Sequence, residues 1–538
     1  MSSEHNERFR FGSGSWASLL DMRRAGLLGS QGMAIGRLGR EDLRLETDAP
    51  FLTIGGAGSG KMRDLLATAV SLNAHKRNFI LDPRGEIASV TMPSFAMAGA
   101  KVYCWNPMGI HGLPKHRVNP LDILCMNSPH FHADSKLIAT SIIPISGAAN
   151  GRYFELRGSE WTENIMKAQV EFEGSTSFPR LYRIINKIES DNVGWANFLE
   201  RMLASSMDSV RRTAGEMLAK QQDSAREFGA IMGEIYAHLS FLDDPALQAS
   251  LESPDASYAD TCTSRTPMSW FHNIPVEFVP IWSPLLRTMF TVQMLYKSRA
   301  PDAPPINMIT DEAGQLGNFE ALLRSFTFGR GAGVRAWALF QDAGQIVRNF
   351  GAPALQGFIG SAAMRQFFGV RDYQTAQMVS EMLGTETLEY DDTLRQADAR
   401  RQKMHAAIRV MNGDDPFAAY GDLKYNAFAE SHRTKQARAL MTSDEILSMR
   451  EDQQILFVAG KNLKPVMAEK LPYFSRPDLV GRFLPNPFHG PQDRIEVPGR
   501  WGKRTLRIIR EAVPPEFQHL PQYCSTGTWA FVEGHRPT

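Results

Sequence analysis

The segment Gly55-Gly56-Ala57-Gly58-Ser59-Gly60-Lys61 is the feature that most constrains how this chain folds. It follows the apolar residues 51–54, which predict a buried strand, and precedes residues 62–72, which predict a helix. Glycines let backbone N–H groups surround an anion, the helix N-terminus adds partial positive charge, and a lysine can reach the outer phosphate oxygens. The segment therefore predicts a phosphate-binding loop whose nucleotide contacts are Gly55, Gly56, Ala57, Gly58, Ser59, Gly60, Lys61 and Met62.

One position of this loop departs from the usual nucleotide-binding pattern. Gly55-x4-Gly60-Lys61 has the Walker A spacing, but Met62 stands where Ser or Thr normally coordinates Mg²⁺. A thioether is a poor ligand for a hard cation that prefers oxygen. The sequence thus predicts a P-loop NTPase that binds ATP and Mg²⁺ but has an impaired magnesium site. The alternative, a chance glycine-rich turn, is disfavoured by the strand and helix on the expected sides.

Composition narrows the classes of protein to which the chain can belong. Its 538 residues are enough for two or three domains. Lys and Arg number 59 against 58 for Asp and Glu, so the bulk charge gives no indication of nucleic-acid binding. The 4 cysteines lack metal-ligand spacing and are too scattered for a disulfide framework, which indicates a reducing cytoplasm. We find no signal peptide and no apolar stretch of the ~20 residues that a membrane span needs, and we expect a cytoplasmic protein.

Strands alternate with helices in two parts of the chain, which predicts an α/β fold with a parallel sheet. The expected strands are residues 51–54, 78–81, Lys101–Trp105, a segment near 276–278, Ile306–Thr310, 336–340, 363–368 and 454–459. Residues between about 128 and 260 have helical spacing, which predicts an all-α insertion. The predicted division is 1–127 and 261–476 for the two parts of a nucleotide-binding domain, 128–260 for the all-α domain, and 477–538 for a Pro- and Arg-rich tail.

The expected strand Ile306–Thr310 is followed by two acidic residues, as in a Walker B motif. Asp311 can hold Mg²⁺ or its water shell, and Glu312 can orient and deprotonate an attacking water. An apolar strand that ends in acidic residues is common by itself. Together with the phosphate-binding loop in the same sheet, it predicts the second half of an ATPase site.

Two further polar residues could complete such a site. Arg330 lies between glycines and is either a solvated turn residue or an arginine finger that reaches the ATP of a neighbouring subunit. Gln341 follows the expected strand 336–340 and would lie beside Asp311 if the two strands pair. There it could sense the terminal phosphate, or it could be an ordinary strand-end cap.

The tail contains a basic run with one aromatic residue, namely Arg500, Trp501, Lys503, Arg504, Arg507 and Arg510. Such a run could bind DNA or an acidic partner. The interleaved Leu506, Ile508 and Ile509 favour another interpretation, a solvated amphipathic helix.

Many short motifs occur in one order over residues 26–473. Besides the phosphate-binding loop they are Ala25-Gly26-Leu27-Leu28-Gly29, Asp82-Pro83-Arg84-Gly85-Glu86, Arg117-Val118-Asn119-Pro120-Leu121, Trp282-Ser283-Pro284-Leu285-Leu286-Arg287, Asp311-Glu312-Ala313-Gly314-Gln315-Leu316-Gly317, Gly329-Arg330-Gly331, Phe340-Gln341-Asp342, Gln374-Thr375-Ala376, Leu383-Gly384 and Arg438-Ala439-Leu440-Met441-Thr442. With these motifs the chain resembles the type IV secretion coupling proteins, the TraG/TraD group of conjugative DNA-transfer ATPases.

The resemblance implies a RecA-like P-loop NTPase domain interrupted by an all-α domain that meets cargo. It implies a homo-oligomer, a hexameric ring at the cytoplasmic face of the bacterial inner membrane. There the ring would recruit a DNA–relaxase complex or an effector, work with other secretion components, and use ATP to move single- or double-stranded DNA, or protein, to the channel. The resemblance makes Lys61 the Walker A lysine, Asp311 and Glu312 the Walker B pair, Arg330 the arginine finger that acts in trans, and Gln341 the strand-end glutamine.

Three departures from the family pattern shape the functional hypotheses. They are Met62, alanine at position 313 where the family usually carries phenylalanine, and the transmembrane helices that usually precede the nucleotide domain, which we do not find. The leading hypothesis is an ATP-dependent coupling motor, held at the membrane by a partner. The alternative is an adaptor or assembly factor that binds nucleotide and hydrolyses it poorly. A P-loop ATPase unrelated to secretion is disfavoured by the motifs outside the nucleotide site.

Overall fold

An 11-stranded β-sheet carries the glycine-rich loop. Its strand order is β2-β1-β13-β12-β9-β3-β8-β7-β4-β6-β5. The strands are β1 (Met33–Leu38), β2 (Glu41–Leu45), β3 (Phe51–Gly55), β4 (Arg77–Pro83), β5 (Lys101–Trp105), β6 (Met268–Ile274), β7 (Ile306–Thr310), β8 (Val334–Phe340), β9 (Met364–Phe368), β12 (Gln453–Val458) and β13 (Val466–Glu469). The strands from β9 to β5 in this order are parallel, and β2, β1 and β12 add antiparallel pairings. The predicted α/β fold with a parallel-core sheet is confirmed.

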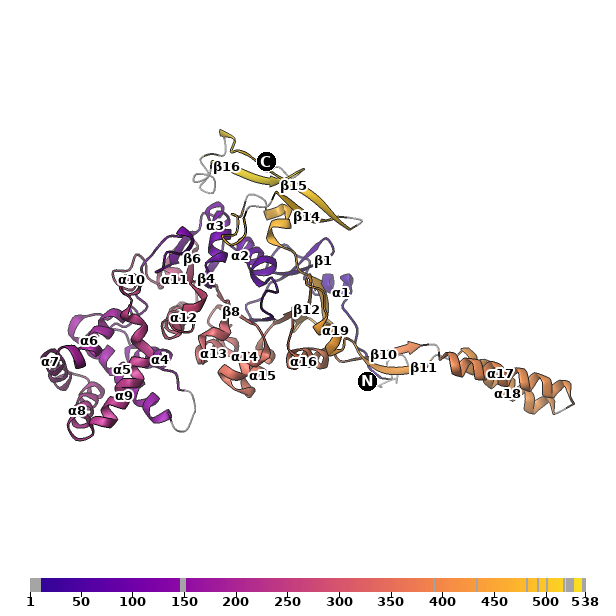
Figure 1. Ribbon diagram of the computed structural model, residues 1–538, viewed down its shortest axis with the longest axis horizontal. Helices are drawn as coiled ribbons and strands as arrows, with labels where there is room; N and C mark the ends of the chain where they lie inside the picture. The colour runs from indigo at the N-terminus through magenta and orange to yellow at the C-terminus, as the bar shows by residue number, and fades with distance from the viewer. Residues whose placement is uncertain are drawn as a thin grey trace. The chain divides into compact units, whose positions relative to one another are not determined.

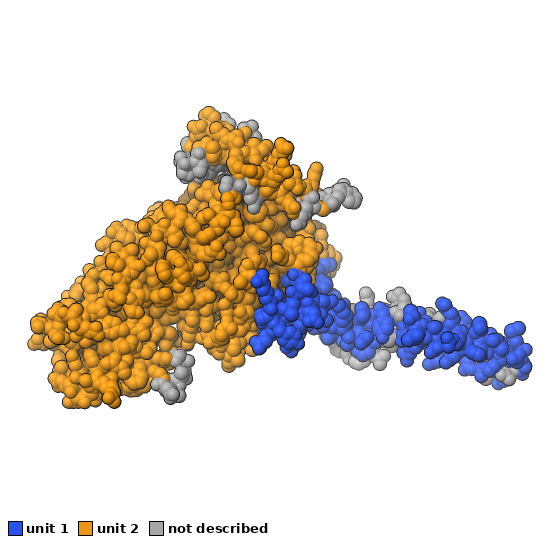
Figure 2. Space-filling model, viewed as in Figure 1, with its two compact units in different colours: residues 1–18, 370–449, 464–466 blue, residues 19–369, 450–463, 467–538 orange. Residues whose placement is uncertain are grey.

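The computed structural model describes residues 11–145, 151–390, 392–413, 415–431, 434–479, 482–490, 493–499, 502–515, 518 and 527–534. The chain divides into two units, which Figure 2 shows in orange and blue. The orange unit, named here the sheet unit, comprises residues 19–369, 450–463 and 467–538. The blue unit, named the hairpin unit, comprises residues 1–18, 370–449 and 464–466.

Burial explains why the central strands could be recognised in the sequence. Every residue of β3, β4, β7 and β8 is buried, as expected for parallel strands covered by helices on both faces. The helices that connect these strands are α2 (Ala67–Leu72), α3 (Glu86–Met97), α12 (Ser283–Ser298), α13 (Glu320–Phe328), α14 (Ala343–Phe350) and α15 (Ala352–Ser361). The helix after the glycine-rich loop begins as a π-helical turn, η2 (Lys61–Leu66), and continues as α2.

The prediction of a strand near residues 276–278 is wrong, because these residues form a 3₁₀ turn. The strand in this part of the chain is β6, which ends just before them. The sequence of β6 contains Ser269, His272 and Asn273, and the polar residues hid its strand character. All three side chains are buried, and each finds a partner inside the sheet unit. Burial also lowers the pKa of His272 to about 4, so this residue is neutral in the core.

A helical segment separates β5 from β6. Its helices are α4 (Phe131–Ile142), α5 (Arg152–Glu173), α6 (Phe178–Ser190), α7 (Asn192–Leu203), α8 (Asp208–Asp223), α9 (Ala225–Leu239), α10 (Pro245–Ser250) and α11 (Asp260–Thr263), of which α5 to α9 lie together in Figure 1. The buried guanidinium of Arg287, on α12, donates to the carbonyls of Ser141 and Ile142 at 2.8 and 3.1 Å. Helix α4 is therefore fixed to the helices that cover the sheet.

The hairpin unit contains a long helical hairpin that the sequence analysis did not foresee. Strand β10 (Thr385–Tyr390) pairs antiparallel with β11 (Thr434–Ala439), and α17 (Thr393–Met411) and α18 (Pro416–Ser431) lie between them in sequence (Figure 1). Small residues fill the seam of the hairpin, since Ala399 and Ala406 are only 5% and 3% exposed. Met411 and Phe417 are 85% and 88% exposed. Helices α16 (Tyr373–Leu383) and α19 (Ser443–Leu447) complete the unit.

The basic run of the tail is a strand, and the predicted amphipathic helix is wrong. Strands β14 (Arg494–Gly499), β15 (Gly502–Ala512) and β16 (Thr528–Val532) form an antiparallel sheet. Leu506 and Ile508 are half-buried, while Thr505 and Arg507 are exposed, which is the two-residue period of a strand. Arg500 and Trp501 lie outside the described residues.

Among the helices that the structure describes, none has the length and apolar character needed to cross a membrane.

Candidate nucleotide-binding site

The candidate site lies at the edge of the sheet where the parallel strands end. Strand β3 runs into the glycine-rich loop, β7 is followed by Asp311 and Glu312, and β8 is followed by Gln341. Because β3, β8 and β7 are neighbours in the sheet, these residues come together in space. The carboxyl ends of parallel strands are where α/β proteins bind their ligands.

Lys61, Glu312 and Gln341 form one connected group. Lys61 Nζ lies 3.2 Å from Glu312 Oε1 and donates to the Gly55 carbonyl at 3.1 Å. Gln341 Nε2 donates to Glu312 Oε2 at 2.8 Å, which places Gln341 against the residue that follows Asp311. Glu312 has φ 54°, a left-handed conformation that is uncommon for a residue with a side chain and is often found at functional sites.

Two buried carboxyl groups lie beside this group. Burial, together with the neighbouring Glu312 carboxylate, raises the pKa of Asp311 to about 7. Burial also raises the pKa of Asp82 to about 8, although the Ile87 and Ala88 N–H groups donate to it at 3.1 and 2.8 Å. Asp82 thereby fixes the first turn of α3, whereas Asp311 accepts from one backbone donor within the described residues, the Glu312 N–H at 3.0 Å. A nearby cation would favour the ionised form of both groups.

The side chains at the site fit Mg²⁺ only if a bound nucleotide supplies some of its ligands. Among the described residues, no group of three or more His, Cys, Asp or Glu side chains is arranged to hold a metal ion. Mg²⁺ usually takes one or two carboxylates and completes its shell with phosphate oxygens and water. Asp311 could supply such a carboxylate, and the phosphates of a bound nucleotide would supply further ligands.

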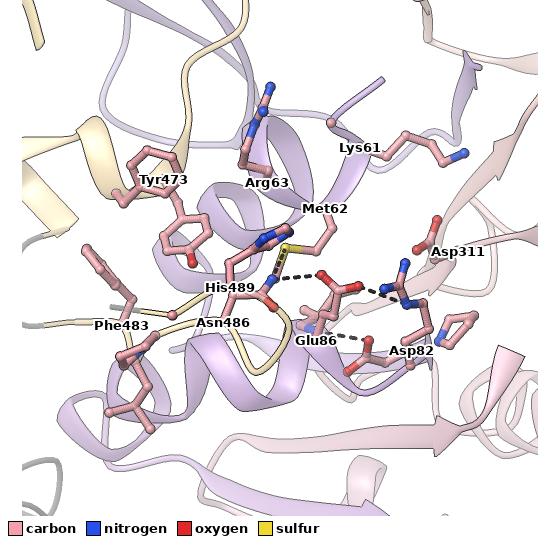
Figure 3. Close-up of a pocket in the computed structure, with 18 of the residues that line it drawn as sticks. Lys61, Met62, Arg63, Asp82, Glu86, Asp311, Tyr473, Phe483, Asn486 and His489 are labelled. Atoms are coloured by element: carbon pink, nitrogen blue, oxygen red, sulfur yellow. Dashed lines mark hydrogen bonds and ion pairs between the residues drawn. The ribbon is translucent and has the colours of Figure 1, made fainter. Parts of the chain in front are cut away.

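Met62 and Lys61 point in opposite directions (Figure 3). The Met62 side chain packs against a buried apolar cluster that consists of Ala67, Val90, Tyr473 and Leu479. Its sulfur lies 4.0 Å from Asn486 Nδ2, and the same nitrogen donates to Glu86 Oε2 at 2.8 Å. The thioether therefore serves the packing of the C-terminal segment and does not face the carboxylates beside Lys61.

A cavity of about 800 Å³ opens beside the glycine-rich loop. Residues 56–63 line it together with Asp311, Glu312 and Gln341. Further lining comes from residues 473–474, 483–486 and 489–490 and from parts of β15 and β16. Ligand cavities in proteins commonly measure about 300–1,000 Å³. The cavity is large enough for a nucleoside triphosphate whose phosphates lie on the loop.

Arg330 is not part of this group of residues. Its side chain is 70% exposed, and Nε lies 3.0 Å from Asp48 Oδ1 at the surface of the sheet unit. An exposed pair of this kind contributes little stability, on the order of 0–1 kcal/mol. The guanidinium could therefore leave Asp48 at little cost.

Sequence reasoning missed several residues of the site. Asn486 gives no local signal, because it lies in an irregular segment far from the motifs in sequence. Lys470 likewise stands alone at the end of β13, yet its amine contacts the glycine-rich loop. Glu86 belongs to the motif Asp82-Pro83-Arg84-Gly85-Glu86, which signalled importance but not a role.

Comparison with known proteins identifies one matching family. The model of the type IV secretory system conjugative DNA transfer family matches residues 15–409 and 423–492, which is most of the chain. The tip of the helical hairpin lies outside the match.

Individual relatives are more distant. The type IV secretion system-coupling protein VirD4 of Bartonella quintana is 25% identical over 241 residues, which are 44% of this chain and 33% of VirD4. The conjugal transfer protein TraG of Rhizobium radiobacter is 22% identical over 456 residues, which are 80% of this chain and 63% of TraG. The chain thus spans less than two thirds of the length of these curated relatives.

The fold has solved counterparts. The bacterial conjugative coupling protein TrwB, without its first 70 residues and unbound, has a TM-score of 0.60 at 16% identity and covers 85% of this chain and 93% of its own. TrwB in complex with ADP and Mg²⁺ has a TM-score of 0.58 at 15% identity, with the same coverage. These likenesses show a common fold.

Proposed function

The chain belongs to the type IV secretory system conjugative DNA transfer family and is a type IV coupling protein, and we propose that it is an ATP-dependent motor that delivers cargo to the secretion channel. The observation that carries the proposal is the group of Lys61, Glu312 and Gln341 at the mouth of a nucleotide-sized cavity. A phosphate lysine, a carboxylate base and a polar sensor at the ends of adjacent strands are the parts that ATP hydrolysis requires.

The contacts of Glu312 suggest how ATP would activate the site. Lys61 and Gln341 both contact the Glu312 carboxylate. The phosphates of ATP would compete for Lys61, because a triphosphate carries more negative charge than one carboxylate. Glu312 would then be released toward a water molecule near the terminal phosphate, and Mg²⁺ held by Asp311 would supply charge stabilisation there.

A second candidate function is an adaptor that binds nucleotide and hydrolyses it poorly. The orientation of Met62 favours it, because the side chain after the P-loop lysine is used for apolar packing and offers no oxygen. In this case the chain would gather cargo or assist assembly in the same secretion system, with nucleotide as a structural ligand.

We propose that the working form is a homo-oligomeric ring, a hexamer by family resemblance, at the cytoplasmic face of the inner membrane. The exposure of Arg330 supports a role on a neighbouring subunit, since its guanidinium is accessible and only weakly tied to Asp48. The all-α part, about residues 128–260, contributes none of Lys61, Asp311, Glu312 or Gln341. We propose that it recognises the cargo, a DNA–relaxase complex or an effector protein.

The test is ATP hydrolysis by the purified full chain, measured alone and with single- or double-stranded DNA. The Lys61→Ala variant should lose nucleotide binding, since the lysine charge and its phosphate hydrogen bonds are both removed. The Glu312→Gln variant should bind ATP but not hydrolyse it. Binding without measurable hydrolysis in the wild type, with or without DNA, would select the adaptor. Wild-type protein that binds no nucleotide would rule out both functions.

A further inference from the structure

A buried lysine contacts the glycine-rich loop but does not line the cavity, and the proposed function gives it no role. Lys470 follows β13, and its side chain is only 1% exposed. Its Nζ donates to the Ser59 carbonyl at 2.6 Å, lies 3.7 Å from Asp64 Oδ2, and stands 4.1 Å from the centre of the Phe368 ring. The amine therefore connects the loop, the first turn of the helix after it, and the end of strand β9.

The same part of the loop is tightly enclosed on other sides. A Cβ atom on Gly60, which has φ 82°, would come within 2.3 Å of Asp64 Oδ2. A Cβ atom on Gly369, which has φ 55°, would come within 2.4 Å of the Ser59 Cβ. The Ser59–Gly60 peptide is thus tightly packed against Asp64, Gly369 and Lys470.

The hydrogen bond from Lys470 fixes which way this peptide faces. In a planar trans peptide, the C=O and the following N–H point in opposite directions. When Lys470 holds the Ser59 carbonyl, the Gly60 N–H must point away from Lys470, in the opposite direction within the peptide plane. A phosphate-binding loop requires its N–H groups to converge on the anion, and a carbonyl turned toward the phosphate would repel it.

A buried ammonium group is energetically unfavourable at this position unless its interactions with neighbouring groups compensate for the loss of hydration. Burying a charge away from water costs several kcal/mol per ion in a typical protein interior. Burial accordingly lowers the pKa of Lys470 to about 8, and Asp64 compensates only in part. An apolar side chain of similar length could fill the same space at lower cost.

We propose that Lys470 is a positioning residue for nucleotide binding, whose ammonium group holds the Ser59–Gly60 peptide so that the Gly60 N–H is presented to a phosphate. This inference rests on the proposed nucleotide site.

The first test measures equilibrium binding of a fluorescent, non-hydrolysable ATP analogue to the full chain. Lys470→Met should raise the Kd about 10-fold, which corresponds to ~1.4 kcal/mol. Lys470→Arg keeps a charged donor and should stay near the wild-type Kd. The matched control is Lys461→Met, which removes an exposed lysine in the turn between β12 and β13 and should change nothing. Circular dichroism and thermal unfolding show whether each variant is folded.

The second test varies the pH and compares the wild type with Lys470→Arg, which keeps a positive charge. The charged groups that face Lys470 are Asp64, Arg63 and Glu451. Because nucleotide binding requires the ammonium form, affinity should be full below about pH 8 and should fall as the pH rises above it. Asp311 and Asp82 titrate in the same range, so the informative quantity is the difference between wild type and Lys470→Arg, whose guanidinium stays charged.

The outcomes separate this inference from the proposed function. A folded Lys470→Met variant that binds the analogue like the wild type would overturn the positioning role. A lower melting temperature with an unchanged Kd would overturn it as well, because that pattern indicates a purely structural lysine. Parallel pH profiles for wild type and Lys470→Arg would contradict the titration argument. Failure of the wild type itself to bind would instead refute the proposed nucleotide site.

Discussion

Replacing Met62 with threonine should make the protein less stable and a faster ATPase. The Met62 side chain is half-buried against the cluster around Tyr473. Truncating a fully buried methionine costs about 2–5 kcal/mol, so a half-buried one should cost roughly 1–2 kcal/mol of unfolding free energy. A threonine hydroxyl would sit on Cβ, next to the backbone that follows Lys61, at the sequence position where P-loop proteins carry the hydroxyl that coordinates Mg²⁺.

The gain in turnover can be estimated from the missing ligand. If the hydroxyl lowers the barrier by about 1.4 kcal/mol, turnover rises about 10-fold, and less Mg²⁺ is needed to reach half of the maximal rate. The assay is ATP hydrolysis at increasing Mg²⁺ concentration, together with thermal unfolding of each variant.

Met62→Ala is the matched control, because it removes the same packing without adding an oxygen. Both variants should melt at lower temperature than the wild type, and only Met62→Thr should hydrolyse ATP faster. Equal rates and equal Mg²⁺ dependence in the two variants would show that position 62 does not reach the metal.

Three further outcomes are expected. Arg330→Ala and Glu312→Gln proteins should each be inactive, yet a mixture should regain some ATPase activity at interfaces that combine an intact finger with an intact base; no recovery in a demonstrably mixed oligomer would argue against action in trans. Replacing residues 146–243 by a flexible linker should preserve ATP binding and abolish capture of relaxase or effector, and normal capture by such a folded variant would refute the cargo role; α4 is kept because Arg287 depends on its carbonyls. Joining β10 to β11 by a short turn in place of the helical hairpin should leave the Kd for nucleotide unchanged. A higher Kd in this variant would show that the helical hairpin contributes to nucleotide binding.

Local patterns were sufficient to predict the centre of the fold. Strands β3, β7 and β8 are contiguous apolar runs, and such runs are what a sheet buried on both faces requires. Strand β6 was not predicted, because its polar residues Ser269, His272 and Asn273 bond to partners from elsewhere in the chain. His272 bonds to Tyr258 and to the Ile80 carbonyl, and no short window of sequence contains those contacts.

The site divides in the same way. The phosphate-binding loop and the Asp311-Glu312 pair are local motifs, and their juxtaposition follows from parallel strands that end at one edge. Lys470 and Asn486 contact Ser59 and Met62, although each lies more than 400 positions away from its partner in the sequence. Their contribution depends on tertiary packing, which spacing and composition do not encode.

The strand order has a consequence for how the protein is made. Strands β12 and β13 come late in the sequence but lie between β9 and β1 in the sheet. On the ribosome, the N-terminal hairpin β1–β2 must therefore wait for more than 400 further residues before Arg37 can pair with Glu469. Until β12 has been made, the edge of β9 is uncovered, which is a known route to aggregation, and Lys470 is synthesised later still. A nascent chain that already contains the whole glycine-rich loop therefore still lacks the Lys470 contact that holds the Ser59 carbonyl.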